Sequence, residues 1–340
     1  MSVARHVAAA ADPVAAVLEA HDRGELIALR TSGTTSEPRA VVRTTSSWFD
    51  SFPHVTQLAG VHRRARVWLP GPLSATMNLF AAVHARYTGA TVVDAPDGAT
   101  HAHLTPAQLR AALQQGADLA GVHVVVAGDR LPRDVAGRAR ATGARVSHYY
   151  GAAELSFVAW GTDEADLRPF PGVEVQVRGG VLWVRSPYLC QGYDRGDGPF
   201  TLDADGFATV GDRGSLDGGV LTVAGRGAEV VLTGGATVLV ADVELGLRRA
   251  GVPDVVVIGV PHRRLGNIVA AVVTDVAVVE QARAAARDAL ASVQRPRMWF
   301  HLPRFPVTAA GKVDRAAVAA LAGAGQLSAV PRTRVSGARS

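Results

Sequence analysis

Small hydroxylated residues around a glycine form the first stretch of this sequence that could do chemistry, the run Thr31-Ser32-Gly33-Thr34-Thr35-Ser36. The apolar run from Leu26 to Leu29 predicts a strand before it, and residues 46–48 predict the start of a helix after it. Backbone N–H groups in such a loop, together with the hydroxyls, can bind an anion. We expect the triphosphate of ATP, although no Gly-Lys-Ser/Thr follows as in a Walker loop. An ordinary Ser/Thr turn is the alternative.

A single lysine is the second unusual feature. Lysine and arginine together number 35, and only Lys312 is a lysine. An ammonium group is a compact point charge on a thin stem, whereas a guanidinium group is a broad planar fork. A site that needs one cation between several oxygen atoms would therefore take the lysine. The alternative is a surface lysine that has no chemical role.

Composition limits the class of protein. The chain has 340 residues, of which 48% are apolar, so it is long enough for about two domains and is not expected to be disordered. Its apolar runs are too short for a transmembrane helix, and its first residues lack a secretory signal. The single cysteine, Cys190, fits a reducing cytoplasm. The net charge of +5 forms no basic block, so we expect neither a nucleic-acid nor a membrane partner. The oligomeric state stays open, with a homodimer as one option.

The elements that must position these residues fall into three regions. Up to about Phe170, predicted strands and helices alternate, which predicts an α/β fold with a largely parallel sheet covered by helices. One of the helices is expected to begin with a capping box at Thr105 and Gln108. Short strands then flank glycine turns such as Gly179–Gly180, which predicts a small antiparallel β-barrel or sheet. We expect a large domain over residues 1–227, an α+β lid domain over 228–322 and a disordered tail over 323–340.

Six motifs occur in the order found in the adenylate-forming superfamily of acyl-CoA synthetases, luciferases and peptide-synthetase adenylation domains. The sequence resembles that superfamily from about residue 26 to 320. Each motif is weak alone, but their order and the position of the only lysine make a strong signal. The motifs are residues 31–39, Tyr150-Gly151-Ala152-Ala153-Glu154, residues 182–187 with Gly192-Tyr193, residues 206–214, Gly225-Arg226 with Gly234-Gly235 and Val243-Glu244, and residues 306–315.

This resemblance implies a large α/β domain with an attached β-barrel, a mobile α+β lid, and an enzyme that uses ATP, Mg²⁺ and CoA. A carboxylate would attack the α-phosphorus of ATP and expel pyrophosphate, so catalysis depends on positioning and charge neutralisation. The implied roles are phosphate binding by Thr31, Ser32, Gly33, Thr34 and Thr35, Mg²⁺ binding by Glu154, adenosine binding by Tyr150, Gly151, Asp212 and Arg226, carboxylate and α-phosphate binding by Lys312, and CoA binding by Gly234 and Gly235. Without such roles, Glu154 would be a surface carboxylate, Tyr150 a core tyrosine and Asp212 a turn residue.

Several positions depart from the pattern of the superfamily. Ser36, Arg39 and Ala40 replace a glycine, a lysine and a glycine, and Ala153 replaces the threonine of the Tyr-Gly-x-Thr-Glu motif. Ala228 stands at the hinge, and Leu73 appears where the acyl pocket usually has a histidine. Most of the usual N-terminal subdomain is also missing from the sequence, as in short o-succinylbenzoate–CoA ligases, which are the nearest comparison.

We therefore expect a cytoplasmic acid–thiol ligase that adenylates a small aromatic or short-chain acid and transfers the acyl group to CoA. A long fatty acid is less expected, because the missing subdomain would supply walls for a long tunnel. A first alternative keeps the adenylation step but uses another acceptor, such as a carrier-protein thiol or an amine. A second alternative is a non-catalytic nucleotide-binding protein.

Overall fold

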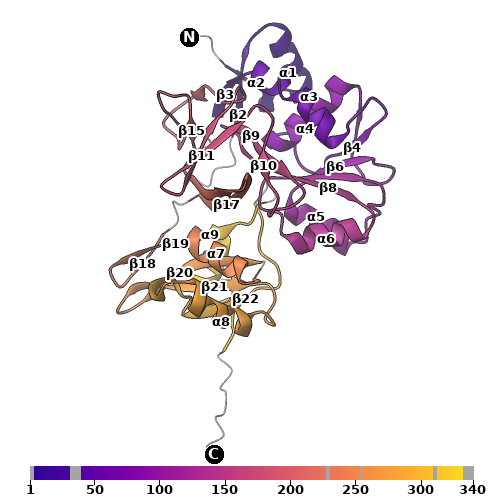
Figure 1. Cartoon of the computed structure of the whole chain (residues 1–340). Coiled ribbons are helices and arrows are strands. Elements are labelled where there is room, and N and C mark those ends of the chain that lie inside the picture. Colours follow the sequence, from indigo (N-terminus) through magenta and orange to yellow (C-terminus); the bar gives the residue numbers. More distant parts are fainter. Residues whose placement is uncertain (1–3, 31–39, 227–229, 253, 309–311, 332–340) are drawn as a thin grey trace, which may run out of the picture. The chain divides into compact units, whose positions relative to one another are not determined.

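The computed structural model describes residues 4–30, 40–226, 230–252, 254–308 and 312–331 (Figure 1). The chain divides into two compact units, and each is described by itself. The first unit comprises residues up to Val223 together with Lys312, and the second comprises the other described residues. The division falls a few residues before the boundary expected at Ala228, which itself lies outside the described residues. Within the described part, no helix is long and apolar enough to cross a membrane.

A small sheet at the start of the first unit contains the strands on both sides of residues 31–39. Its strands run in the order β1-β2-β3-β13, and β2 pairs with β3 in antiparallel register from Leu26 opposite Thr44 to Arg30 opposite Ala40. The expectation of a loop between a strand and a helix is therefore wrong, because residues 31–39 join two antiparallel strands. The short helix α2 begins only after β3. The bounds are β1 Arg5–His6, η1 Val7–Ala9, α1 Pro13–Asp22, β2 Leu26–Arg30, β3 Ala40–Thr44, α2 Ser46–Phe49, α3 Phe52–Ala59 and β13 Gly192–Tyr193.

The central sheet of the first unit has the strand order β10-β9-β8-β7-β6-β4-β5. Neighbours from β5 through β8 are parallel, as expected, whereas β9 and β10 are antiparallel additions. Helix α4 covers one face and helices α5 and α6 cover the other (Figure 1). The bounds are β4 Arg66–Trp68, α4 Thr76–Thr88, β5 Thr91–Val93, β6 His101–Leu104, α5 Pro106–Gln114, β7 His123–Val126, α6 Arg133–Ala141, β8 Arg145–Ala152, β9 Ser156–Gly161 and β10 Arg168–Pro169.

Local sequence signals placed several of these elements correctly. The capping box at the start of α5 is present, because the Thr105 hydroxyl accepts from Gln108 N and the Gln108 side chain accepts from Thr105 N. The glycine hairpin between β11 (Glu174–Arg178) and β12 (Val181–Arg185) is also present, with Arg178 opposite Val181. Both Gly179 and Gly180 have positive φ angles, 57° and 78°, which L-residues with a side chain adopt only with strain.

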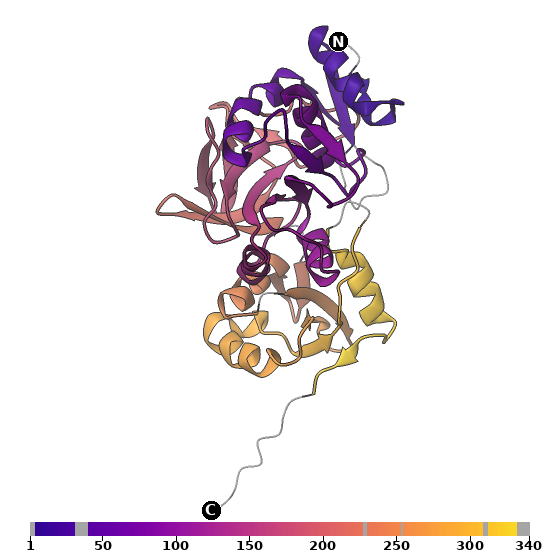
Figure 2. The same cartoon turned by 90° about the vertical axis from the view of Figure 1, so that its right-hand side faces the viewer.

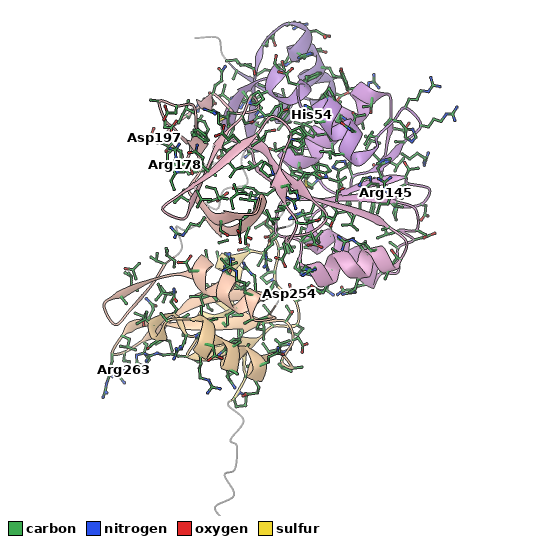
Figure 3. All side chains as sticks on the ribbon, in the orientation of Figure 1. His54, Arg145, Arg178, Asp197, Asp254 and Arg263 are labelled. Atoms are coloured by element: carbon green, nitrogen blue, oxygen red, sulfur yellow. The ribbon has the colours of Figure 1, made fainter. Side chains whose placement is uncertain are left out.

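The antiparallel sheet that follows has the strand order β14-β15-β12-β16-β17, with β11 paired to β12. On its surface, Arg178, labelled in Figure 3, lies 4.8 Å from the ring centroid of Trp183 and forms an ion pair with Asp203 at 2.6 Å. The bounds are β11 Glu174–Arg178, β12 Val181–Arg185, β14 Thr201–Leu202, β15 Ala208–Thr209, β16 Asp212–Asp217 and β17 Val220–Arg226.

The second unit has a sheet of order β19-β18-β21-β22-β23, with β20 paired to β21. Successive residues of β20 face opposite sides, so Val255 and Val257 join the cluster beneath α7 and α8, while Val256 and Ile258 join the one beneath α9. Figure 2 shows α9 on one side of this sheet, with α7 and α8 on the other. The bounds are β18 Val230–Thr233, β19 Ala236–Leu239, α7 Val240–Arg249, β20 Val255–His262, β21 Gly266–Val273, α8 Val279–Ala289, η2 Ser292–Gln294, β22 Met298–His301, α9 Arg315–Gly323 and β23 Ser328–Ala329.

The expectation of a disordered tail from residue 323 is wrong as far as residue 331. Residues Ser328 and Ala329 form β23, which pairs with His301 and Phe300 of β22. The side chain of Leu327 is buried in the cluster beneath α9. This short strand was missed because its pairing partner lies far away in the sequence.

Candidate functional site

The structure brings Tyr150 and Asp212 together. Tyr150 lies near the end of β8, and its hydroxyl donates a hydrogen bond to Oδ2 of Asp212, the first residue of β16, at 2.7 Å. Asp212 is buried, with 8% of its surface exposed, so it is more than a solvated turn residue. The resemblance gave adenine and ribose binding to these two side chains, and their contact is compatible with one nucleoside site.

Gly151 permits the backbone geometry that follows Tyr150. The β8–β9 register shifts between Tyr150 and Gly151. A Cβ atom on Gly151 would lie 2.2 Å from the carbonyl oxygen of Ser156, a contact that backbone atoms cannot accommodate. Ser156 itself adopts a positive φ of 59°. The tight turn between the strands therefore requires glycine here, and it carries Glu154 at its tip.

Glu154 is buried rather than a surface carboxylate. Only 6% of its surface is exposed, and its Oε1 accepts a hydrogen bond from the Tyr193 hydroxyl at 2.9 Å. Burial, and then the negative charge of Glu154, raise the pKa of Tyr193. Tyr193 therefore stays protonated at neutral pH and remains a donor to the carboxylate.

The strand that carries Tyr193 is tied to β3. In β13, Gly192 pairs with Val42 and Tyr193 pairs with Val41. The flanking backbone extends this pairing, since Gln191 N donates to Val42 O at 2.8 Å and Asp194 N donates to Ala40 O at 2.9 Å. Glu154 is thus connected, through Tyr193, to the strand that begins directly after residues 31–39.

Arg43 is a buried residue of this region that the sequence analysis missed. It lies on β3 and is fully buried, and its Nη2 donates to the carbonyl oxygen of Ala153 at 2.7 Å. Burial lowers its pKa to about 10, and this shift is opposed by Cys190 and Glu154. The signal that could have found it is the period of two along β3, which puts Arg43 on the same buried face as Val41.

Lys312 is exposed, and the described residues on either side of residues 309–312 are joined by backbone contacts. Val307 and Val313 form an isolated antiparallel bridge, and Asp314 N donates to Pro306 O at 2.8 Å. Asp314 then caps α9, because its side chain accepts from Ala317 N at 3.0 Å. These contacts fix the described residues of the second unit on either side of residues 309–312.

A buried ion-pair network anchors the start of α9 just beyond this segment. Arg315 Nη2 donates to Glu244 Oε2 at 2.6 Å, and Val257 N donates to Glu244 Oε1 at 2.8 Å. Arg248, one turn further along α7, also pairs with Glu244. Burial alone would raise the pKa of Glu244, but the bond from Arg315 and the charges of Arg248 and Arg315 hold it below its usual value. Glu244 therefore stays ionised near neutral pH.

Other expected site residues are only partly described. Thr31, Ser32, Gly33, Thr34 and Thr35 lie outside the described residues. Arg226 ends β17, but its side chain also lies outside them. Gly234 and Gly235 form the turn between β18 and β19, both with positive φ, at 55° and 82°.

The donor set around Glu154 fits Mg²⁺ bound together with nucleotide phosphates. Among the described residues, no group of three or more His, Cys, Asp or Glu side chains could form a metal cage. Mg²⁺ at ATP-dependent sites is usually held by one or two carboxylates, substrate phosphate oxygens and water. A single buried carboxylate, oriented by a tyrosine, meets that requirement.

Comparison with known proteins gives the family. The AMP-binding enzyme family matches residues 26–194. A probable 2-succinylbenzoate–CoA ligase of Mycobacterium tuberculosis is 30% identical over 86% of this chain and 83% of its own length. Among solved structures, a variant of Escherichia coli MenE with bound OSB-AMS is similar at a TM-score of 0.73, with 25% identity over 89% of this chain and 70% of that one.

A third similarity concerns a different reaction. The amide bond synthetase McbA of Marinactinospora thermotolerans matches at a TM-score of 0.68, with 28% identity over 84% of this chain and 68% of that one.

The chain therefore belongs to the AMP-binding, adenylate-forming enzymes. It is an AMP-forming acid–CoA ligase by family, a class that uses ATP, an acid and CoA. The fold class and family expected from the motifs are confirmed.

Proposed function

We propose that this enzyme adenylates a small aromatic carboxylic acid with ATP and transfers the acyl group to the thiol of CoA. In the first step, a carboxylate oxygen attacks the α-phosphorus, the bond to the bridging oxygen breaks, and pyrophosphate leaves. In the second step, the thiol loses its proton to solvent, its sulfur attacks the acyl carbonyl carbon, and AMP leaves. The contact between Tyr150 and Asp212 carries the proposal, because it places a planar ring beside a carboxylate able to accept ribose hydroxyls.

Each expected site residue keeps its role as part of this proposal. Mg²⁺ would be held by Glu154 and phosphate oxygens, where it would neutralise charge on the leaving pyrophosphate. Lys312 would supply the cation between the substrate carboxylate and the α-phosphate. The remaining roles are phosphate binding by Thr31, Ser32, Gly33, Thr34 and Thr35, adenosine binding by Tyr150, Gly151, Asp212 and Arg226, and contact with the pantetheine arm by Gly234 and Gly235.

The two steps need different groups, and this favours a second unit that acts as a lid. We propose that this lid is the second unit, from the expected boundary near Ala228 through β23. Lys312 would serve adenylation, and the Gly234–Gly235 turn would serve thioester formation after the lid has moved. A cytoplasmic location fits the buried, unpaired thiol of Cys190 and the supply of ATP and CoA.

The relatives named 2-succinylbenzoate–CoA ligase support an aromatic acid with a short acyl arm. The similarity to an amide bond synthetase supports one rival, in which an amine takes the place of the CoA thiol as the acceptor. The acceptor is therefore the part of the proposal that most needs a direct test.

The test is pyrophosphate release from ATP and Mg²⁺ with a panel of aryl, succinylated aryl and short-chain acids, each with CoA, with an amine or with neither. Lys312→Ala tests the cation, and Arg263→Ala, which removes an exposed cation of the second unit, is its matched control. We expect release that depends on an aryl acid, rises with CoA and is lost only in Lys312→Ala. Faster turnover with amines than with CoA would instead favour amide formation. ATP binding without release for any acid would refute the enzymatic proposal.

A further inference from the structure

The burial of the Arg43 guanidinium costs free energy that packing contacts do not offset. A guanidinium group has five N–H donors. Arg43 is fully buried, and its hydrogen bonds are Nη2 to Ala153 O at 2.7 Å and Nη1 to Ser47 Oγ at 3.3 Å. Within the described part of the chain, its buried Nε has no hydrogen-bond partner. Burying a cation with an unmet donor is costly, so a neutral side chain would stabilise the fold better unless the cation has another role.

The direct contacts of Arg43 lead to Glu154 through the backbone. The Ala153 carbonyl belongs to the peptide unit that ends at the nitrogen of Glu154, so the guanidinium holds the plane of that peptide. The carbonyl of Glu154 itself accepts from Cys190 N at 2.8 Å, and its carboxylate accepts from Tyr193 at 2.9 Å. Three hydrogen bonds therefore hold Glu154: one at the carbonyl of the preceding residue, one at its own carbonyl and one at its carboxylate.

All three hydrogen bonds come from residues of β3 or of the segment that leads into and forms its neighbouring strand β13. Arg43 lies on β3, and residues 190–193 lead into and form the strand that pairs with β3. Ala153 has only a methyl group where the superfamily pattern has a threonine, so its own side chain cannot hydrogen-bond. The backbone contact from Arg43 is thus a principal fixed point of the turn on the side that precedes Glu154.

We propose that Arg43 is a positioning residue that holds the Glu154 turn so that the carboxylate meets the metal ion bound with ATP. This inference rests on the proposed function, because it assigns the metal to Glu154. Arg43 acts through the Ala153 carbonyl and touches neither metal nor nucleotide.

Positioning and simple electrostatics predict opposite results. If the charge of Arg43 were its only effect, a neutral residue would remove repulsion and tighten the binding of a divalent cation. If Arg43 positions Glu154, the same substitution loosens the carboxylate and weakens metal binding. Groups that orient metal ligands typically contribute 10- to 100-fold to metal affinity.

The experiment measures calorimetrically the affinity for ATP, with excess Mg²⁺ and separately with EDTA, in the full chain and without acid. We expect Arg43→Met to weaken the binding of Mg²⁺–ATP about tenfold and to leave the binding of metal-free ATP unchanged. In a Glu154→Gln background, Arg43→Met should have no further effect on Mg²⁺–ATP. Leu109→Ala, a core change away from this turn, controls for lost stability and should change neither affinity.

The outcomes separate this inference from the proposed function. Unchanged or tighter binding of Mg²⁺–ATP by Arg43→Met, or an equal loss in the Glu154→Gln background, would overturn the role of Arg43 alone. A wild-type chain that does not bind Mg²⁺–ATP, or a Glu154→Gln variant that binds it normally, would overturn the proposed metal site as well. If Arg43→Met does not fold, Arg43→Lys is tested instead, because its ammonium group keeps the positive charge but lacks the planar set of N–H donors of a guanidinium. The affinity of Arg43→Lys for Mg²⁺–ATP should fall by at least about threefold, and unaltered binding would overturn the inference.

Discussion

Mild acid should destabilise the first unit, because its central sheet encloses several neutral histidines. His103 on β6 is almost fully buried, and burial lowers its pKa to about 3. Burial also lowers the pKa of His84 on α4 and of His123 on β7, each to about 4. Burial likewise lowers the pKa of His101 on β6. Repulsion from Arg145 and from neighbouring histidines lowers the pKa values of His101 and His123 further.

The size and direction of the effect follow from linkage between protonation and folding. Unfolded histidine titrates near pH 6.5, so below that pH the unfolded chain binds protons that the folded chain does not bind. Stability therefore falls as pH drops from about 6.5 to about 4, by about 1.4 kcal/mol per pH unit for each such histidine. At pH 5, His84, His103 and His123 together would cost about 6 kcal/mol, a large part of the 5–15 kcal/mol typical of a protein.

The assay is urea unfolding followed by tryptophan fluorescence at several pH values between 7.5 and 4.5, with the wild-type chain and His103→Leu. Removing one buried titrating group should reduce the slope of unfolding free energy against pH by about 1.4 kcal/mol per unit. His54→Gln is the matched control, since His54, labelled in Figure 3, is only half-buried. A free energy that is constant from pH 7 to pH 5, or a His103→Leu slope equal to that of the wild type, would refute the reasoning.

Three further substitutions test individual contacts. Tyr150→Phe removes the hydrogen bond to Asp212 and should weaken AMP binding by about 1 kcal/mol, measured by calorimetry; unchanged affinity would argue against a shared nucleoside site. Arg315→Met removes one partner of buried Glu244 and should lower the free energy of unfolding of the second unit by about 3 kcal/mol, measured by urea unfolding at Trp299; a loss below the error of the fit would contradict it. Gly151→Ala should lower the melting temperature of the first unit, because its Cβ would meet Ser156 O, and an unchanged melting curve would show that the turn relaxes freely.

Much of the fold was predictable because its signals are local. The capping box of Thr105 and Gln108 and the hairpin at Gly179–Gly180 depend on residues that are neighbours in the sequence. The failures involve long-range pairing. Strand β3 was missed in favour of a longer loop, although its register with β2 is regular, and β23 was missed because it pairs with β22.

The part of the candidate site that lies in the six sequence motifs could be predicted from the order of those motifs. Tyr150, Glu154 and Asp212 were identified through the resemblance of their motifs to those of the adenylate-forming superfamily. The structure adds that Tyr150 and Asp212 are in contact and that Glu154 is buried. Arg43 has no such motif. Alternation along β3 puts Arg43 on the same face as buried Val41, but this signal is usable only once β3 itself has been recognised as a strand.

The sequence by itself indicated the class of chemistry, because six motifs in the order of the adenylate-forming superfamily, with the only lysine of the chain in one of them, resemble enzymes in which two anions must meet. Only the tertiary structure decided how Glu154 is held. Arg43 and Ala153 are 110 residues apart, and their contact depends on strand pairing and burial that no local pattern encodes. Burial also turns an ordinary set of histidines into groups whose charging opposes folding, since desolvation acts only once the sheet and helices have closed around them.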